Sequence, residues 1–322
     1  MDAIITNELT KTYGSVTAVH GINLRVPEGV AFACIGGEGS GKTTLIRMLS
    51  GLCRPSSGEC DVLGIKPYLE AKKLHTVAGT VLSSARMYDH MTLSENLRFY
   101  ALLNGMDEND ALDRISTLLH RLDIWEGRDE TFRDLPTGAA VRASLARALI
   151  GRPKVLLIDE PVGGLDKETA EYMQDLLSEQ EAREGLTVLL CTRNTEYAQQ
   201  LCRQFAILDR GSMLASGDLE ALRQRVGLQL RAELLLGEGE TPPKGKDFLH
   251  INGKWQRNIK HEDELPGIVA QCVWADKSVF QAGIIRPTLE DIYTAFLAGG
   301  TVKAGDGYGE TESEAERFSE EP

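Results

Sequence analysis

The sequence predicts an α/β fold with a mostly parallel sheet. Two apolar segments, V-L-L-I at 155–158 and T-V-L-L-C at 187–191, are typical of strands that are buried on both faces of such a sheet. A third apolar segment, F-A-C-I at 32–35, runs into a glycine-rich turn. Helical patterns lie between these segments, and the alternation of strands with helices favours parallel pairing.

The flanking segments predict the other parts of the fold. Short alternating strands around turns over residues 1–35 predict an antiparallel N-terminal β subdomain. Thr92 and Glu95 have the spacing of a capping box, so a helix is expected to begin there. Together with two further helical patterns, this helix predicts an inserted helical lobe at about 84–150.

The C-terminal part of the chain is expected to form separate units. A main domain over 1–225 is followed by a linker over 226–246, which is expected because its second half is polar and rich in Pro and Gly. Residues 247–300 are expected to form a small α+β accessory domain. The remaining 301–322 are expected to be an acidic disordered tail, since seven carboxylates and one arginine occupy 304–322 without core-forming residues.

The composition argues against several classes of protein. A net charge of −13 over 322 residues disfavours a nucleic-acid binder, which relies on basic side chains to contact phosphates. The chain has no apolar run of the ~18–20 residues that span a bilayer, and its first residues do not resemble a signal peptide. The cysteines show no C-x-x-C pair, so buried free thiols are expected rather than disulfides or a metal site.

The strongest motif is G-G-E-G-S-G-K-T at 36–43, which follows a predicted strand and opens a predicted helix. Glycines allow successive backbone N–H groups to curl around phosphates, and the N-terminus of the helix adds partial positive charge. Lys42 is expected to reach the β- and γ-phosphates, and Thr43 to ligate Mg²⁺. The alternative is a chance glycine-rich turn. The expected nucleotide contacts are Gly36, Gly37, Glu38, Gly39, Ser40, Gly41, Lys42, Thr43 and Thr44.

A second motif, D-E-P, ends the buried strand V-L-L-I. Two carboxylates at this position lie at the carboxyl edge of the sheet, where ligands of such sheets bind. Asp159 is expected to hold Mg²⁺, and Glu160 to orient or deprotonate the attacking water. The alternative is a pair of solvated acids at a strand end. Taken together, the two motifs predict a P-loop NTPase that binds a nucleoside triphosphate with Mg²⁺.

From about residue 3 to residue 222 the chain resembles an ABC (ATP-binding-cassette) transporter ATP-binding subunit, above all in A-S-L-A-R-A-L-I-G-R-P-K-V-L-L-I-D-E-P-V-G-G-L-D. The resemblance implies an ATP-binding domain over 1–225 in which Tyr13 stacks on adenine. It also implies that Asp166 lies in a loop through which two ATPase subunits communicate. P-T-L-E-D-I-Y at 287–293 is similar to ATPase subunits of exporters with a separate permease chain.

The first departure from the family pattern is in the signature motif. Family members pair head to tail, and each ATP lies between the P-loop of one subunit and a signature, usually L-S-G-G-Q, of the other. This chain has L-P-T-G-A in that place. Pro136 removes a hydroxyl and a backbone donor, and Thr137 adds bulk where backbone approaches phosphate. Gly138 remains as an expected contact to the nucleotide.

Two further family positions also depart from the pattern. Ser83 occupies the place of a glutamine that senses Mg²⁺ and water, and its hydroxyl is too short for the same reach. Arg193 occupies the place of a histidine. A guanidinium can grip a γ-phosphate, but it stays protonated and cannot relay a proton as imidazole can. We therefore expect ATP binding to survive and hydrolysis to be slow, with Glu160 and Arg193 as the catalytic positions.

The leading interpretation is an ATPase subunit that drives export through a membrane permease, located in the cytoplasm on the inner face of the plasma membrane. It would act with a second ATPase subunit, as a homodimer or a heterodimer, and without nucleic acid. A second interpretation is an ATP-binding but non-hydrolytic regulatory subunit beside an active partner, although the retained Glu160 argues against it. A third is a soluble relative in translation or DNA repair, which the acidic charge and the single cassette disfavour.

Overall fold

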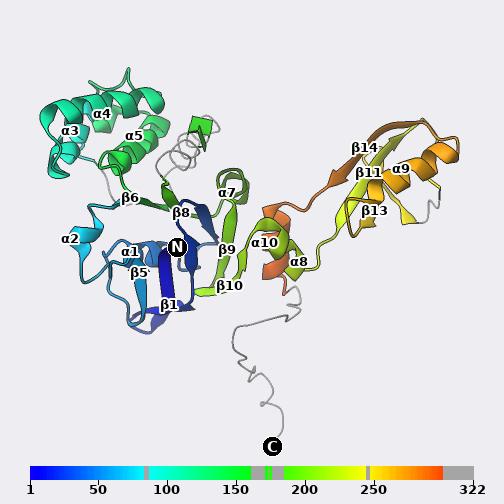
Figure 1. Ribbon diagram of the computed structural model, residues 1–322, viewed down its shortest axis with the longest axis horizontal. Coiled ribbons are helices and arrows are strands. Elements are labelled where there is room, and N and C mark those ends of the chain that lie inside the picture. Colours follow the sequence, from blue (N-terminus) through cyan, green and yellow to red (C-terminus); the bar gives the residue numbers. More distant parts are fainter. Residues whose placement is uncertain (83–86, 161–170, 173, 176–184, 244–246, 300–322) are drawn as a thin grey trace, which may run out of the picture.

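The computed structural model describes residues 1–82, 87–160, 171–172, 174–175, 185–243 and 247–299. Figure 1 shows a body built around a central sheet, a helical lobe at one end and a smaller sheet unit at the other. Extended segments connect that smaller unit to the body. Ser83, Asp166 and the tail expected over 301–322 lie outside the described residues.

The central sheet has six strands in the order β10-β9-β4-β8-β7-β6, and all neighbours pair in parallel except β10 with β9. The strands are β4 (Ala31–Ile35), β6 (Ala78–Leu82), β7 (Val155–Asp159), β8 (Thr187–Thr192), β9 (Gln204–Asp209) and β10 (Ser212–Gly217). Successive side chains alternate between two cores: Phe32 and Cys34 enter one, and Ala33 and Ile35 the other. Burial on both faces explains the nearly continuous apolar runs, and the predicted α/β class is confirmed.

An antiparallel sheet packs against one of these cores. It contains β1 (Asp2–Tyr13), β2 (Val16–Ile22), β3 (Arg25–Pro27) and β5 (Ser57–Val62), with the other three strands pairing with β1. Helix α1 (Lys42–Leu49) buries Leu45, Ile46 and Met48 in the same core. The short helix α2 (Ala71–Leu74) precedes β6. The P-loop helix is therefore held between the two sheets.

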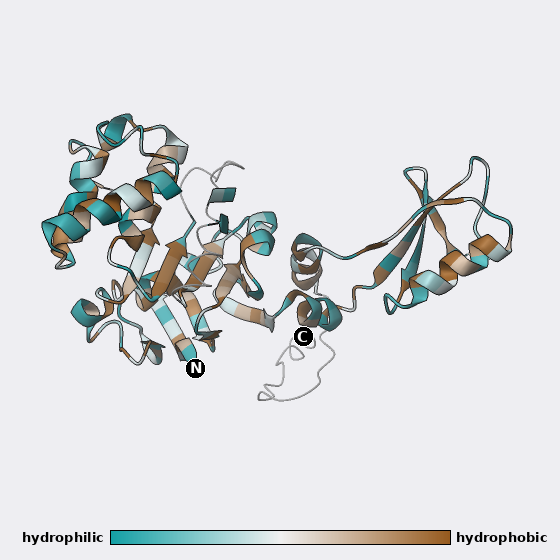
Figure 2. Ribbon diagram, turned by 45° about the horizontal axis from the view of Figure 1, so that its top comes forward, coloured by the Kyte–Doolittle hydropathy of each residue, from teal (hydrophilic) through white to brown (hydrophobic). Residues whose placement is uncertain are grey.

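The helical lobe contains α3 (Leu93–Leu103), α4 (Glu108–Arg121), the 3-10 turn η1 (Phe132–Asp134) and α5 (Thr137–Leu149). The predicted capping box is present, since the Thr92 hydroxyl accepts from the Glu95 amide and the Glu95 carboxylate accepts from the Thr92 amide. Figure 2 shows apolar residues gathered along the strands of the body, and both apolar and hydrophilic residues along the helices of this lobe. Leu102 and Leu103 of α3 and Leu112 of α4 are exposed, so the surface of the lobe is partly apolar.

The boundary of the C-terminal unit requires a correction. The range 226–246 was expected to be a linker, but it contains β11 (Leu230–Leu236), a central strand of the unit's antiparallel sheet β12-β13-β11-β14. The strand alternates between buried and more exposed residues, and its buried residues share a core with Ile268 and Cys272 of α9. Its sequence was obscured by the polar Pro/Gly stretch that follows it. The other elements are β12 (Leu249–Ile251), β13 (Lys254–Ile259), α9 (Glu264–Trp274) and β14 (Val279–Ile285).

The end of the expected accessory domain also requires a correction. Helix α10 (Leu289–Leu297) does not belong to the core of that unit, because Leu289, Ile292 and Phe296 are buried in the core of the body. It contacts α7 (Thr195–Leu201) and α8 (Leu219–Arg225), as Figure 1 illustrates for α8. The accessory unit is therefore bracketed by two segments of the body.

Two expectations from composition can be compared with the structure. The cysteines are free, and all are buried except Cys53, which is partly exposed, so the prediction of free thiols is confirmed. Among the described helices, none combines the length and apolarity required to cross a bilayer.

Candidate functional site

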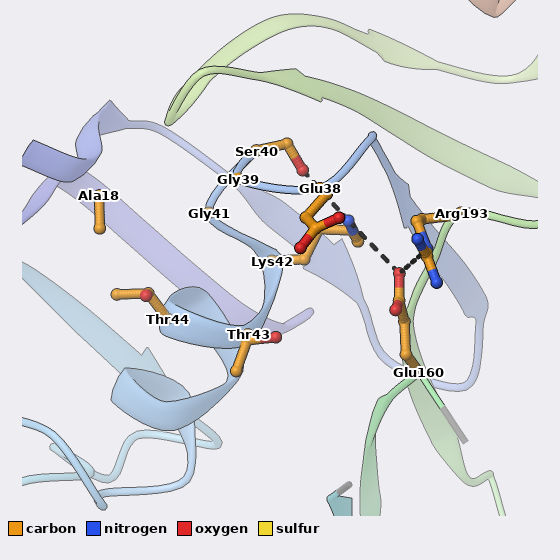
Figure 3. Close-up of a pocket in the computed structure, with 10 residues that line it drawn as sticks. All are labelled: Ala18, Glu38, Gly39, Ser40, Gly41, Lys42, Thr43, Thr44, Glu160 and Arg193. Atoms are coloured by element: carbon orange, nitrogen blue, oxygen red, sulfur yellow. Dashed lines mark hydrogen bonds and ion pairs between the residues drawn. The ribbon is translucent and has the colours of Figure 1, made fainter. Parts of the chain in front are cut away.

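The P-loop lies between the end of β4 and the start of α1 (Figure 3), and close contacts require glycine at two of its positions, Gly36 and Gly41. A Cβ on Gly36 would come within 2.4 Å of the Leu208 carbonyl oxygen. Gly41 has φ +96°, and a Cβ there would come within 2.6 Å of the Ala18 carbonyl oxygen. Side chains would therefore disrupt the loop, whose bare backbone is the kind that receives phosphate oxygens.

Lys42 lies at the base of this loop, where its side chain is 6% exposed. Its ammonium group donates to the carbonyl oxygens of Gly36 and Gly37, at 2.7 and 2.8 Å, and to Ser40 Oγ at 3.2 Å. These acceptors are neutral, so the charge of Lys42 is compensated chiefly by Glu160, whose Oε1 lies 3.5 Å from Nζ. A buried cation in such surroundings favours an anionic ligand.

Thr43 and Asp159 meet across the site. Thr43 Oγ1 donates to Asp159 Oδ1 at 3.1 Å, so the first turn of α1 contacts the carboxyl end of β7. Burial raises the pKa of Asp159 and the Glu160 charge adds to this, while the hydrogen bond from Thr43 acts in the opposite direction. A divalent cation would relieve the cost of this buried charge. A hydroxyl and a carboxylate fit Mg²⁺, which takes few protein ligands and keeps waters and phosphates.

Glu160 follows β7 directly and faces the same pocket (Figure 3). Its backbone has φ +29°, a conformation that is uncommon for a residue with a side chain, and its amide donates to the Cys191 carbonyl oxygen at 2.9 Å. Oε1 is buried and accepts no hydrogen bond from the residues that the structure describes. It lies 3.3 Å from Arg193 Nε and 3.5 Å from Lys42 Nζ. A buried carboxylate oxygen without a donor is suited to accept from a bound water.

The P-loop, Glu160 and Arg193 surround one pocket of about 440 Å³, a size typical of small-molecule sites. Two carboxylates, Glu38 and Glu160, and two cations, Lys42 and Arg193, line it. Ala18 on β2 also lines the pocket and was not among the expected residues. Its small apolar side chain carries no chemical signal, so only its position beside the loop identifies it.

Tyr13 and Gly138 lie outside this lining. Tyr13 ends β1, is 46% exposed, and its hydroxyl lies 3.3 Å from Cys53 Sγ, a contact that raises the pKa of Tyr13. Gly138 lies in the first turn of α5 in the helical lobe. The structure therefore does not bring Gly138 to the phosphate pocket of its own chain.

The acidic groups of the described chain do not assemble a metal site by themselves. No cluster of three or more His, Cys, Asp or Glu side chains with metal-binding geometry occurs among the described residues. Asp159 and Thr43 therefore fit a cation whose remaining ligands come from nucleotide and water.

Asp159→Asn is expected to abolish the stabilisation that Mg²⁺ adds to bound ATP, while stabilising the nucleotide-free chain at neutral pH. Because the folded-state pKa of Asp159 is raised, its favourable contribution is present at acidic pH and is lost as the pH rises through that pKa. The amide keeps an acceptor for Thr43 but carries no charge for the metal. At a ligand concentration 100-fold above Kd, wild type gains about 2.7 kcal/mol.

Thermal unfolding with ATP, with and without Mg²⁺, measures this effect. An Asp159→Asn variant that still gains stability from Mg²⁺ would contradict the assignment of Asp159 as the metal ligand. Lowering the pH toward the raised pKa of Asp159 is expected to weaken the Mg²⁺ effect in wild type.

The sequence of the chain is similar to those of ABC transporter ATP-binding proteins. Residues 19–163 match the family model described as ABC transporter. The mouse glucosylceramide transporter ABCA12 is 32% identical over 231 residues, which span 70% of this chain and 9% of that protein. The daunorubicin resistance ATP-binding protein DrrA3 of Streptomyces coeruleorubidus is 29% identical over 300 residues, covering 90% of this chain and 94% of its own length.

A solved structure has the same arrangement of elements. The dimeric ATP-binding cassette MJ0796, in a post-hydrolysis state with ADP and Pi, superimposes with a TM-score of 0.62 at 25% identity. The match covers 67% of this chain and 98% of that one. The chain thus spans nearly the full length of the solved cassette MJ0796 but only 9% of the length of the transporter ABCA12.

Proposed function

The chain belongs to the ABC transporter family as an ATP-binding subunit, and from that premise we propose that it binds Mg-ATP, hydrolyses it slowly and drives export through a separate membrane permease. The observation that carries the proposal is the contact of Thr43 Oγ1 with Asp159 Oδ1 at 3.1 Å, beside Lys42 and Glu160 at one pocket. Calorimetry with Mg-ATP and turnover of the chain with its permease test it. No binding at millimolar nucleotide would overturn it.

In this proposal each residue in or near the pocket has one task. The P-loop amides and Lys42 hold the phosphates, and Tyr13 stacks on the base. Thr43 and Asp159 hold Mg²⁺, which neutralises charge on the phosphate oxygens. Glu160 Oε1, which is buried and accepts no described hydrogen bond, orients the attacking water and accepts its proton.

A second subunit and a permease complete the proposed assembly. Gly138 lies outside its own chain's pocket, which supports a pairing in which it reaches the nucleotide of another subunit. The related cassette MJ0796 is dimeric, and the Streptomyces relative, which the chain matches nearly end to end, is named for daunorubicin resistance. We place the assembly on the cytoplasmic face of the plasma membrane, with the second subunit either identical or different.

Slow hydrolysis is supported by two local features. Pro136 is the N-cap of α5 and has neither a backbone N–H nor a hydroxyl, so the start of the helix that would point at the partner's γ-phosphate offers fewer donors. Arg193 forms an ion pair with Glu160, where family members have a histidine. Each loss of a preorganised donor to a transition state costs ~10²–10³ in rate, although such losses do not simply add.

Arg193→His is expected to raise ATP turnover by about 10-fold, because imidazole exchanges protons near neutral pH and a guanidinium does not. The gain is smaller than the full effect of a general acid–base group because Pro136 and Thr137 remain. Steady-state phosphate release measures it. Arg193→Lys is the matched control, since it retains the positive charge without a proton relay, and equal rates in the two variants would contradict the explanation.

The ion pairs of Glu160 also favour a second candidate function, that of an ATP-binding but non-hydrolytic regulatory subunit. Lys42 and Arg193 both lie within 3.5 Å of Oε1 and compete with a water for it. In a pair of two different ATPase subunits, this chain would then hold ATP while the partner subunit hydrolyses it. Wild-type turnover that does not exceed that of Glu160→Gln would favour this function.

A further inference from the structure

Helix α10 is fastened to the segment that carries Arg193. The Leu289 amide donates to Gln199 Oε1 at 2.7 Å, and Thr195 Oγ1 donates to Glu290 Oε2 at 2.5 Å. Both partners belong to α7, whose N-cap, Asn194, directly follows Arg193. The last described helix is therefore held beside the nucleotide site by hydrogen bonds as well as by its buried apolar face.

From this position α10 reaches the P-loop. The hydroxyl oxygen of Tyr293 lies 3.5 Å from the point that a Cβ on Gly37 would occupy. Burial raises the pKa of Tyr293, and the proximity of the Gly37 backbone acts in the opposite direction. Tyr293 is half-buried against the core of the body and does not line the phosphate pocket. It therefore contacts the loop from its outer side.

Gly37 is held from the pocket side as well. Its carbonyl oxygen accepts from Lys42 Nζ and from Ser40 Oγ, each at 2.8 Å. Lys42 and Ser40 are themselves expected to contact nucleotide, so their bonds to Gly37 are open to exchange when phosphate binds. The Tyr293 contact does not compete with phosphate. Unlike the two side-chain bonds, it does not involve a group that is expected to contact nucleotide.

We propose that Tyr293 is a positioning residue of the nucleotide site, which holds the Gly37 end of the P-loop in the conformation that receives phosphate. The inference rests on the proposed function, because it assigns Tyr293 a part in ATP binding. A glycine segment has much backbone freedom to lose, so an external restraint lowers the cost of ordering the loop around a ligand. Residues 286–288 connect α10 to β14. The helix that contacts the P-loop is therefore also the one that directly follows the accessory unit in the chain.

Tyr293→Phe tests the proposal, since it removes the hydroxyl and keeps the ring in its packing site. We expect the Kd for Mg-ATP to rise about 2- to 10-fold, the effect of losing one polar contact to the loop. KM for ATP is expected to rise with kcat unchanged, and amide hydrogen exchange of 36–41 in the nucleotide-free chain to accelerate. The melting temperature of that chain is expected to stay within error of wild type. Thr294→Ala, an exposed change on the same helix, is the control.

The outcomes separate this inference from the function on which it rests. Absence of Mg-ATP binding by the wild-type chain would overturn both. Wild-type binding with an unchanged Kd in Tyr293→Phe, or with unchanged exchange of 36–41, would overturn the positioning role alone. Equal weakening by Thr294→Ala would also overturn it, because the effect would then belong to α10 as a whole. Exchange at 36–41 is compared with exchange in the core strands β7 and β8, so acceleration confined to the loop is distinguished from a general loss of stability.

Discussion

ATP turnover is expected to fall by about 10²- to 10⁴-fold in Glu160→Gln, while Mg-ATP binding persists. The amide matches the carboxylate in size but cannot accept a proton from water. The residue that it replaces has a buried Oε1 which accepts no hydrogen bond from the described residues, so this oxygen can accept one from a water. Ground-state contacts to the phosphates come from the P-loop and Lys42, and these are unchanged.

Phosphate release under saturating Mg-ATP measures the loss, and calorimetry on the same preparation establishes that binding survives. Glu59→Gln is a suitable control because Glu59 is a surface carboxylate on β5, paired with Lys66 at 2.5 Å and remote from the pocket lining. If Glu160→Gln turns over ATP as fast as wild type, then Glu160 is not the general base. A wild-type rate already at the level of this variant would instead support the regulatory function.

Lys42→Ala is expected to weaken Mg-ATP binding by about 10- to 100-fold, because hydrogen bonds to charged groups are each worth about 1.5–3 kcal/mol. The ammonium lies at the floor of the pocket, with its side chain 6% exposed, where water screens it little. It also donates to the carbonyl oxygens of Gly36 and Gly37, so its removal loosens the loop as well as removing a cation. Both effects act in the same direction.

Isothermal calorimetry at fixed salt measures the change, since the affinity of a charged ligand depends on ionic strength. Lys66→Ala is the control, because Lys66 is a surface lysine that pairs with Glu59. This variant is expected to bind Mg-ATP as tightly as wild type does. Circular dichroism establishes that both variants are folded. An unchanged affinity in Lys42→Ala would show that nucleotide does not bind at this loop.

Much of the nucleotide pocket could be predicted from the sequence. The glycine pattern at 36–41, with Lys42 and Thr43 at the start of a helix, is a local arrangement whose geometry follows from a few adjacent residues. Asp159 could be predicted because the carboxyl ends of parallel strands converge at one edge of a sheet. The contact between Thr43 and Asp159 at 3.1 Å is the expected result of these two rules.

Predictions were weaker where strand pairing or helix docking is not local. Strand β11 was read as part of a linker, since the polar stretch after it dominated the composition, although L-R-A-E-L-L-L alternates over its first half. Its identity as a strand depends on pairing with β13 and β14, which lie further along the chain. Helix α10 has an apolar face, but nothing in its sequence indicates that this face packs on the body rather than on the accessory sheet.

The sequence by itself therefore determined which residues we propose for the chemistry of the site: the backbone that would cradle phosphates, the side chains that would hold Mg²⁺, and the carboxylate that would activate water. These features depend on residues that are adjacent in the chain or lie at the ends of neighbouring strands. Only the tertiary structure decided that Arg193 pairs with Glu160 and that Tyr293 contacts Gly37. Such contacts join segments that are far apart in sequence, and they form only because burial of apolar faces brings those segments together.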